Sequence, residues 1–264
     1  MATYKAKSIV LKSYRLGESD KIIRLLSMEH GIISAVAKGA CNFKSRFSGR
    51  LELFNIIDCE ISTGRNLDVI SQAEIIEVFR GISSDFFKFN ISQIISEITL
   101  KTQSEGAPST NIFRLLYVAL REINKCSPDD NITLKKILVF FIAKFLKVMG
   151  YVPLFDSCSI CGRNIFAQET VPDQKGFMFS IKYGGAICHE CRKNVEGLLF
   201  IDKTCAEILI SLFSAKIENI ISANVTEKNT DNLLNILENY FIHHMDIRID
   251  SFDYLKKIEK IQLY

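Results

Sequence analysis

Residues 158–162 read Cys-Ser-Ile-Cys-Gly, and residues 188–191 read Cys-His-Glu-Cys. Each pair places two thiols on one tight turn, and the 26 residues between Cys161 and Cys188 suffice for a β-ribbon. Four thiolates from two such turns fill the tetrahedral shell of one zinc ion. The sequence therefore predicts a structural zinc ribbon with the ligands Cys158, Cys161, Cys188 and Cys191.

The same four cysteines have other possible uses. They could form two disulfides or remain free thiols, but the paired Cys-x-x-Cys spacing favours a metal. A catalytic zinc ion needs an open coordination position, which four thiolates do not leave. His189 is therefore expected on the surface. The remaining cysteines are scattered and are expected to be reduced thiols: Cys41, Cys59, Cys126 and Cys205.

Length and composition describe a folded protein of two or three domains. The chain has 264 residues, of which 48% are hydrophobic and 24% are charged. Residues 1–7 lack the apolar core of a signal peptide, and the longest apolar run, residues 137–143, is too short to span a bilayer. We therefore expect a cytoplasmic protein that does not bind membranes.

Positive charge is concentrated at the start of the chain. Residues 1–50 contain ten lysines or arginines and three acidic residues, although the formal net charge of the whole chain is only +3. Such a local excess is typical of a surface that meets a polyanion, and a solvated charged face is the alternative.

The first eighty residues predict a small barrel. Apolar, β-branched segments alternate with turn signals and suggest five short strands, at residues 4–14, 21–28, 31–38, 51–61 and 67–73. A partly open five-stranded barrel is an OB-fold, whose exposed face and loops bind oligonucleotides.

Residues 42–50, Asn-Phe-Lys-Ser-Arg-Phe-Ser-Gly-Arg, form a basic loop within this barrel. Lys44, Arg46 and Arg50 are candidates for phosphate contacts, and Phe43 and Phe47 are candidates for stacking on unpaired bases. Alternatively, either ring anchors the loop to the barrel.

Helical spacing of apolar residues begins at residue 83. It predicts three helices up to residue 149, separated at residues 106–110 and 126–131 and ended by Gly150. Candidate N-caps are Ser109 or Thr110 and Asn131 or Thr133.

After the cysteines, helices are predicted at residues 204–215, 231–244 and 252–263, with a turn at 227–231. His243 and His244 fall at a helix end, where capping of the last carbonyls is commoner than metal binding. The predicted fold class is therefore α+β multidomain, in four segments: an OB-fold at 1–80, a helical domain at 81–149, an inserted zinc ribbon at 150–195 and C-terminal helices at 196–264.

Five stretches resemble the RecO family of bacterial recombination mediators in residues, order and spacing. They are S-I-V-L-K-S-Y-R-L-G-E-S-D (8–20), H-G-I-I-S-A-V-A-K-G-A (30–40), K-S-R-F-S-G-R-L-E-L-F (44–54), G-Y-V-P-L-F-D-S-C-S-I-C-G (150–162) and F-S-I-K-Y-G-G-A-I-C (179–188). The resemblance extends over essentially the whole chain.

The resemblance implies a DNA repair and recombination mediator that is not an enzyme. Such proteins bind single- and double-stranded DNA, anneal complementary strands and, with RecR, help to load RecA on DNA coated by single-stranded DNA-binding protein. The acidic C-terminal tail of that coating protein is expected to dock on the helical region, with RecF as a further partner. Some family members lack the cysteines, so zinc cannot be required for the family's activity. Its implied role is to stabilise the fold. The cations expected to contact DNA are Lys7, Lys12, Arg15, Lys21, Lys38, Lys44, Arg46 and Arg50.

Three other classes of protein fit the sequence less well. A zinc hydrolase or deaminase needs an open metal position and a His-x-Glu arrangement that this chain lacks, and no phosphate-binding loop of the Gly-x4-Gly-Lys-Ser/Thr type is present. A zinc-ribbon transcription factor would read DNA with an insert that is nearly balanced in charge. A non-catalytic scaffold that binds only proteins is the remaining alternative.

Overall fold

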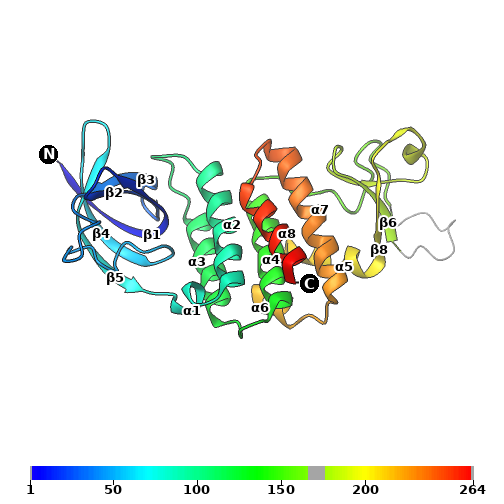
Figure 1. Cartoon of the computed structure of the whole chain (residues 1–264). Helices are drawn as coiled ribbons and strands as arrows, with labels where there is room; N and C mark the ends of the chain where they lie inside the picture. The colour runs from blue at the N-terminus through cyan, green and yellow to red at the C-terminus, as the bar shows by residue number, and fades with distance from the viewer. Residues whose placement is uncertain (1, 166–175, 263–264) are drawn as a thin grey trace. The chain divides into compact units, whose positions relative to one another are not determined.

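A computed structural model describes residues 2–165 and 176–262 (Figure 1). The chain forms two compact units. The first contains Met1–Asp129 and Ile249–Tyr264, and the second contains Asp130–Arg248. The division into two units does not test the four domains expected from the sequence, at 1–80, 81–149, 150–195 and 196–264, and these boundaries remain a prediction.

The first unit begins with a five-stranded barrel, as predicted, and this barrel is closed. Its strands are β1 (Thr3–Leu16), β2 (Asp20–Ser27), β3 (Gly31–Ala37), β4 (Ile56–Ser62) and β5 (Asp68–Glu77). They follow one another in the order β1-β2-β3-β5-β4 around the barrel. The β3–β5 pair is parallel and the other pairs are antiparallel. Inward-facing side chains of all five strands form one buried apolar core.

The predicted fourth strand was placed too early. Residues 51–61 were expected to be extended, but β4 begins at Ile56, and residues 51–55 form turns. Phe54 adopts a positive φ of 70°, a left-handed conformation that cannot continue a strand. Leu51 and Phe54 are nevertheless buried, so these apolar residues fill core space from a loop.

Within residues 2–129 and 249–262, four helices complete the first unit. They are α1 (Arg80–Ser83), α2 (Phe86–Thr102), α3 (Thr110–Lys125) and α8 (Asp250–Gln262). Of the two predicted candidates, Ser109 and Thr110, it is Ser109 that caps α3, because its hydroxyl accepts a hydrogen bond from the Ile112 amide. The predicted closing helix corresponds to α8, although Leu263 lies outside the described residues.

The barrel is joined to these helices at the turn between β2 and β3. The Ile32 amide donates to the Ser104 carbonyl at 3.2 Å, and the Gly106 amide donates to the His30 carbonyl at 3.1 Å. A Cβ atom on Gly31 would lie 2.6 Å from the Ala107 carbonyl oxygen, and its φ is +69°. Only glycine fits this close approach without strain.

The second unit combines helices with a three-stranded sheet. Its elements are α4 (Asn131–Val148), β6 (Gly176–Ser180), β7 (Gly185–Ile187), a 3-10 turn (Cys191–Asn194), β8 (Leu199–Asp202), α5 (Lys203–Leu212), α6 (Ile217–Ser222) and α7 (Glu227–Met245). The sheet order is β7-β6-β8. Helix α4 packs along α7, where the rings of Phe145 and Phe241 lie 6.2 Å apart.

Two sequence predictions about helix starts in this unit are wrong. Helix α4 is capped by Asp130, whose carboxylate accepts from the Thr133 amide at 3.1 Å, rather than by Asn131 or Thr133. Residues 227–231, expected to be a turn, form the first turn of α7 because the Thr226 hydroxyl caps that helix. The short helix α6 was not predicted.

The end of α4 and the histidines of α7 behave partly as expected. Gly150 follows the last turn of α4 with a φ of +85° and ends the helix. His244 has a structural role, but its Nε2 bonds to the Ile181 carbonyl at 2.7 Å, and its ring packs on Tyr240. It therefore joins α7 to the β6–β7 turn, which differs from the predicted capping role; His243 is exposed.

Candidate nucleic-acid interface and metal centre

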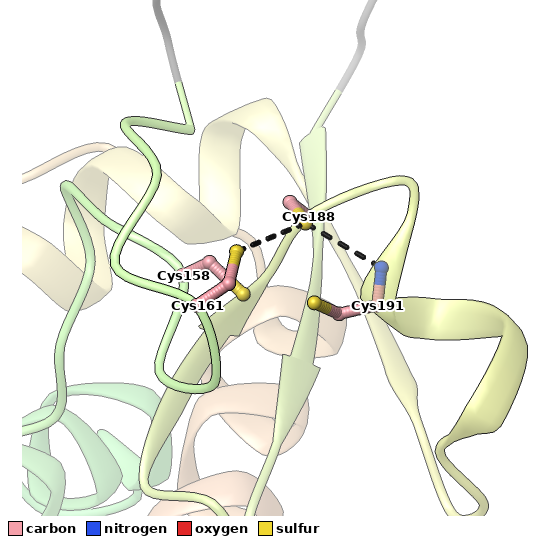
Figure 2. Close-up of side chains that lie close together, drawn as sticks. All are labelled: Cys158, Cys161, Cys188 and Cys191. Atoms are coloured by element: carbon pink, nitrogen blue, oxygen red, sulfur yellow. Dashed lines mark hydrogen bonds between the residues drawn. The ribbon is translucent and has the colours of Figure 1, made fainter.

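The four cysteines predicted as metal ligands lie together in the second unit. Their sulfur atoms are all within 4.8 Å of one another, and the side chains point toward a common centre in Figure 2. The sulfurs of Cys161 and Cys188 are 3.7 Å apart. A tetrahedral zinc ion with bonds of about 2.3 Å separates its thiolates by about 3.8 Å. The donor set and its spacing therefore fit one tetrahedral metal ion.

Local backbone geometry positions the first cysteine pair. The Gly162 amide closes the turn by donating to the Cys158 carbonyl at 2.9 Å, and Gly162 has a φ of +74°. The Ser159 amide donates to the Ala186 carbonyl at 2.9 Å and ties this turn to β7. A Cβ on Gly185 would lie 2.3 Å from the Leu154 carbonyl oxygen, so glycine lets the two segments meet.

The second pair follows directly from β7, and Cys191 starts the 3-10 turn. An ion pair between Arg163 and Glu190 links the two cysteine turns on the exposed surface. His189 is exposed, as the sequence predicted. None of the eight cysteines, all of which the structure describes, is in a disulfide.

Hydrogen bonds within the cluster shift the pKa values of two cysteines in opposite directions. Burial opposes ionisation of Cys158, but hydrogen bonds from the backbone of Cys188 and Cys161 outweigh it and lower the pKa of Cys158 to about 6. Side-chain hydrogen bonds with Cys188 and Cys161 raise the pKa of Cys191 to about 12. These hydrogen bonds therefore favour the thiolate form of Cys158 and the neutral form of Cys191.

The cations predicted to contact DNA fall into separate groups on the barrel. Directly opposite Lys7 in the β1–β4 register lies Asp58, so an acid faces this lysine. A register shift between Val10 and Lys12 inserts an extra residue into β1 and changes which side chains point outward. Beyond the shift, Lys12 lies opposite Arg24, a like-charged pair.

Arg15 and Lys21 also face each other across β1 and β2, but on the opposite side of these strands from Lys12. Lys38 follows β3 close to them. The Gly39 amide donates to the Asp20 carboxylate at 2.8 Å, and this hydrogen bond lowers the pKa of Asp20. The end of β3 is therefore held beside the β1–β2 turn.

The basic loop begins at the same place. The Cys41 amide donates to the Ser19 carbonyl at 2.8 Å. Lys44, Arg46 and Arg50 are exposed, and the Arg50 guanidinium donates to the Arg46 carbonyl. Six of the predicted cations thus belong to the loop or to the strand ends beside which it starts, whereas Lys7 and Lys12 lie elsewhere on the barrel.

The two phenylalanines of the loop differ completely in exposure. Phe43 is 95% exposed, whereas Phe47 is 3% exposed and belongs to the barrel core. The Asn55 amide group donates to the carbonyls of Gly49 and Arg50 and fixes the loop above that core. The structure does not support base stacking by Phe47, which anchors the loop, and leaves Phe43 free to stack.

Two residues on the barrel surface were missed as candidates. Arg24 lies opposite Lys12, and Tyr14, two residues beyond Lys12, is 42% exposed with the Lys12 ammonium 5.0 Å from its ring centroid. The sequence offered one signal for Arg24 as a DNA contact, which is its membership of the basic excess in residues 1–50, and it offered none for Tyr14. Cross-strand register, which the sequence does not reveal, brings these side chains together.

Among the described residues, no helix combines the length and apolar character needed to cross a membrane.

Comparison with known proteins covers nearly the whole chain. The family model for Recombination protein O N terminal matches residues 1–79, and that for Recombination protein O C terminal matches residues 83–251. Curated proteins named DNA repair protein RecO are similar in sequence. The protein of Desulforamulus reducens is 30% identical over 263 residues, which cover 100% of this chain and 98% of the relative.

Two further relatives carry the same name. The protein of Caldanaerobacter subterraneus subsp. tengcongensis is 29% identical over 258 residues, covering 98% of this chain and 99% of the relative. That of Rubrobacter xylanophilus is 34% identical over 194 residues, which cover 74% of this chain and 73% of the relative. A five-stranded barrel followed by helices and a four-cysteine cluster agrees with these matches. The chain therefore belongs to the RecO family of DNA repair proteins.

Proposed function

We propose that this protein is a recombination mediator that binds single- and double-stranded DNA and anneals complementary strands. The observation that carries the proposal is the basic loop, in which three exposed cations stand beside a phenylalanine that is 95% exposed. Cations that contact the backbone together with an exposed aromatic ring that stacks on a base are the combination by which proteins hold single strands.

The proposed mechanism needs no covalent chemistry, and we infer that the protein is not an enzyme. Lys44, Arg46 and Arg50 would neutralise phosphates and release counterions, which lowers the repulsion between two approaching strands. Phe43 would hold a base by stacking and leave its hydrogen-bonding edge free to pair. Weakly held, exposed bases can then find their complements.

Zinc is the metal that we propose for the cysteine cluster. Cys158, Cys161, Cys188 and Cys191 would complete its tetrahedral shell, so the ion would fix the fold of the ribbon and leave no position for a reacting water. The pairing of β6 with β7 and the Arg163–Glu190 ion pair would then be stabilised together with the metal.

The partners that we propose follow from family membership. They are RecR, RecA, the acidic C-terminal tail of single-stranded DNA-binding protein, and RecF. The protein would act in the cytoplasm, on the nucleoid. The exposed Phe86 ring at the start of α2 is one apolar group on the helices of the first unit, where we expect the acidic tail to dock.

A strand-annealing assay tests the proposal. The variant Lys44→Ala/Arg46→Ala/Arg50→Ala should anneal complementary strands slowly, with or without coating protein. Its binding to single strands should depend less on salt, with a slope of log affinity against log salt smaller by about 2, because each lost phosphate contact removes about 0.7. A matched control removes three exposed cations of the second unit, Lys193, Lys203 and Lys216.

Annealing at the normal rate by the loop variant would refute the role of the loop. Equal loss in both triple variants would show that net charge alone is responsible. A protein that ignores single strands, duplexes and mismatched duplexes alike would be a scaffold, and one that prefers a particular duplex sequence would be a transcription factor.

A further inference from the structure

The outer surface of β1, β2 and β3 carries two parallel rows of side chains. Cross-strand register aligns Tyr14, Ile22 and Val36 in one row and Lys12, Arg24 and Ser34 in the next. Ile23 and Ala35, which lie between these rows along their strands, are fully buried in the barrel core. Because neighbouring residues of a strand point to opposite faces, both rows face outward.

The cationic row is electrostatically unbalanced. Like charges directly opposite each other destabilise a sheet, and Lys12 and Arg24 form such a pair. Lys5 and Lys7, by contrast, lie opposite Glu60 and Asp58. Within the described part of the chain, neither Lys12 nor Arg24 forms an ion pair, and the buried Nε of Arg24 has no hydrogen-bond acceptor. An anion bridging Lys12 and Arg24 would remove this repulsion.

The cationic row ends at an acid. The Ser34 hydroxyl donates to the Glu105 carboxylate at 2.8 Å, so negative charge stands beyond Arg24 on the β3 side. A phosphate is therefore favoured over β1 and β2 and disfavoured over β3. The positive charges of Lys12 and Arg24 and the negative charge of Glu105 would together hold a DNA backbone over the Lys12–Arg24 part of the row.

The adjacent row supplies an exposed aromatic face. Tyr14 is 42% exposed and Leu16, two residues further along β1, is 41% exposed. Residues two apart on a strand are separated by about 6.8 Å, so a group over the Tyr14 ring and a phosphate over Lys12 can belong to neighbouring parts of one ligand. An aromatic ring stacks on a nucleobase only when that base is unpaired.

We propose that this face of the β1–β2 hairpin is a second contact for single-stranded DNA, in which Lys12 and Arg24 bind a phosphate and Tyr14 stacks on the adjoining base. The inference rests on the proposed DNA-binding function and adds a strand-selective site outside the basic loop. A duplex has its bases already stacked and gains only the phosphate contact. Tyr14 therefore favours single strands over duplexes.

Affinity measurements test the role of Tyr14. Tyr14→Leu keeps an apolar side chain but removes the aromatic ring, and should weaken binding of labelled oligo(dT) about 5- to 150-fold while leaving duplex binding unchanged. Tyr14→Phe should bind like the unchanged protein. The matched control is Tyr183→Leu. Tyr183 is 44% exposed with the Lys182 ammonium 5.7 Å from its ring centroid, and Tyr14 is 42% exposed with the Lys12 ammonium 5.0 Å from its ring centroid.

A spectroscopic test reports stacking directly. The chain contains no tryptophan, so Tyr14→Trp introduces the only indole. Oligo(dT) should quench its emission, whereas an equal-length duplex should not, and Tyr183→Trp should respond to neither. Arg24→Gln should raise the thermal midpoint of the free protein and reduce the salt slope by about 0.7, since it removes both the repulsion and one phosphate contact.

Unchanged oligo(dT) affinity of Tyr14→Leu, or unquenched Tyr14→Trp, would overturn the inference. If the loop triple variant still lost annealing in that case, the proposed function would stand and only this second contact would fail. If the unchanged protein bound no DNA at any salt concentration, both would fail.

Discussion

The contrast between Phe43 and Phe47 gives a sharp prediction, because the same residue type sits on the same loop in two opposite environments. Phe47 is 3% exposed within the barrel core, so Phe47→Ala should leave a cavity and cost about 3–5 kcal/mol of unfolding free energy. For a folding unit of this size, that corresponds to a decrease of about 6–20 °C in Tm.

Phe43→Ala should change stability by less than about 0.5 kcal/mol, because the ring is 95% exposed. It should instead weaken binding to single strands by about 1–3 kcal/mol, the cost of losing one stacked base. Urea unfolding followed by circular dichroism measures the first quantity, and fluorescence anisotropy of a labelled oligonucleotide measures the second.

A conservative variant separates packing from DNA contact. Phe47→Leu retains most of the core volume and should recover much of the stability lost in Phe47→Ala. If Phe47→Ala were as stable as the unchanged protein, the loop would not be anchored as described. Normal DNA affinity of Phe43→Ala would refute its stacking role.

Three further predictions concern the rest of the molecule. Cys158→Ser should reduce bound zinc from about one ion per chain to nearly none, as measured by elemental analysis, and lower the Tm of the second unit, whereas Cys41→Ser should do neither. Burial opposes ionisation of Glu97, but hydrogen bonds from Lys101 and from the start of α8 outweigh it and lower its pKa from 4.5 to about 2. The stabilisation is therefore complete above pH 4.5 and is lost as the pH falls to about 2, so thermal melts of Glu97→Gln and the unchanged protein should converge over that interval. Asp231→Ala should cost about 1–3 kcal/mol, because it removes the carboxylate 2.7 Å from the buried Lys135 ammonium, and a urea-unfolding cycle that includes Lys135→Met should recover part of the loss.

Features that depend on local pattern could be predicted from the sequence. The cysteine spacing predicted the metal cluster because each pair lies on one tight turn, and the hydrogen bond from the Ser159 amide to the Ala186 carbonyl holds the first turn beside β7 and so brings Cys161 near Cys188. Apolar, β-branched segments between turn signals located the five strands for the same reason, although the fourth was predicted to start at residue 51 rather than at Ile56. The cap of α3 was narrowed to Ser109 or Thr110 because a capping hydroxyl acts only about three residues along the chain.

Features that depend on backbone conformation or cross-strand register could not be predicted. The apolar residues 51–55 resemble strand residues, and only the left-handed Phe54 shows that the chain turns there. Phe43 and Phe47 have the same chemistry, and the path of the loop decides which one is buried. The inserted residue in β1 places Lys12 opposite Arg24, whereas an unbroken register would place Lys12 opposite Ile23.

The position of α8 has a consequence for how the protein assembles during synthesis. This helix follows the entire second unit in the chain, yet it packs against α2, where the Glu97 carboxylate accepts hydrogen bonds from the amides of Asp250 and Ser251. Phe252 and Leu255 are buried. The ribosome must therefore release residues near the C-terminus before the N-terminal unit can be completed, and a nascent chain stopped before residue 249 would expose an apolar strip on α2 to chaperones.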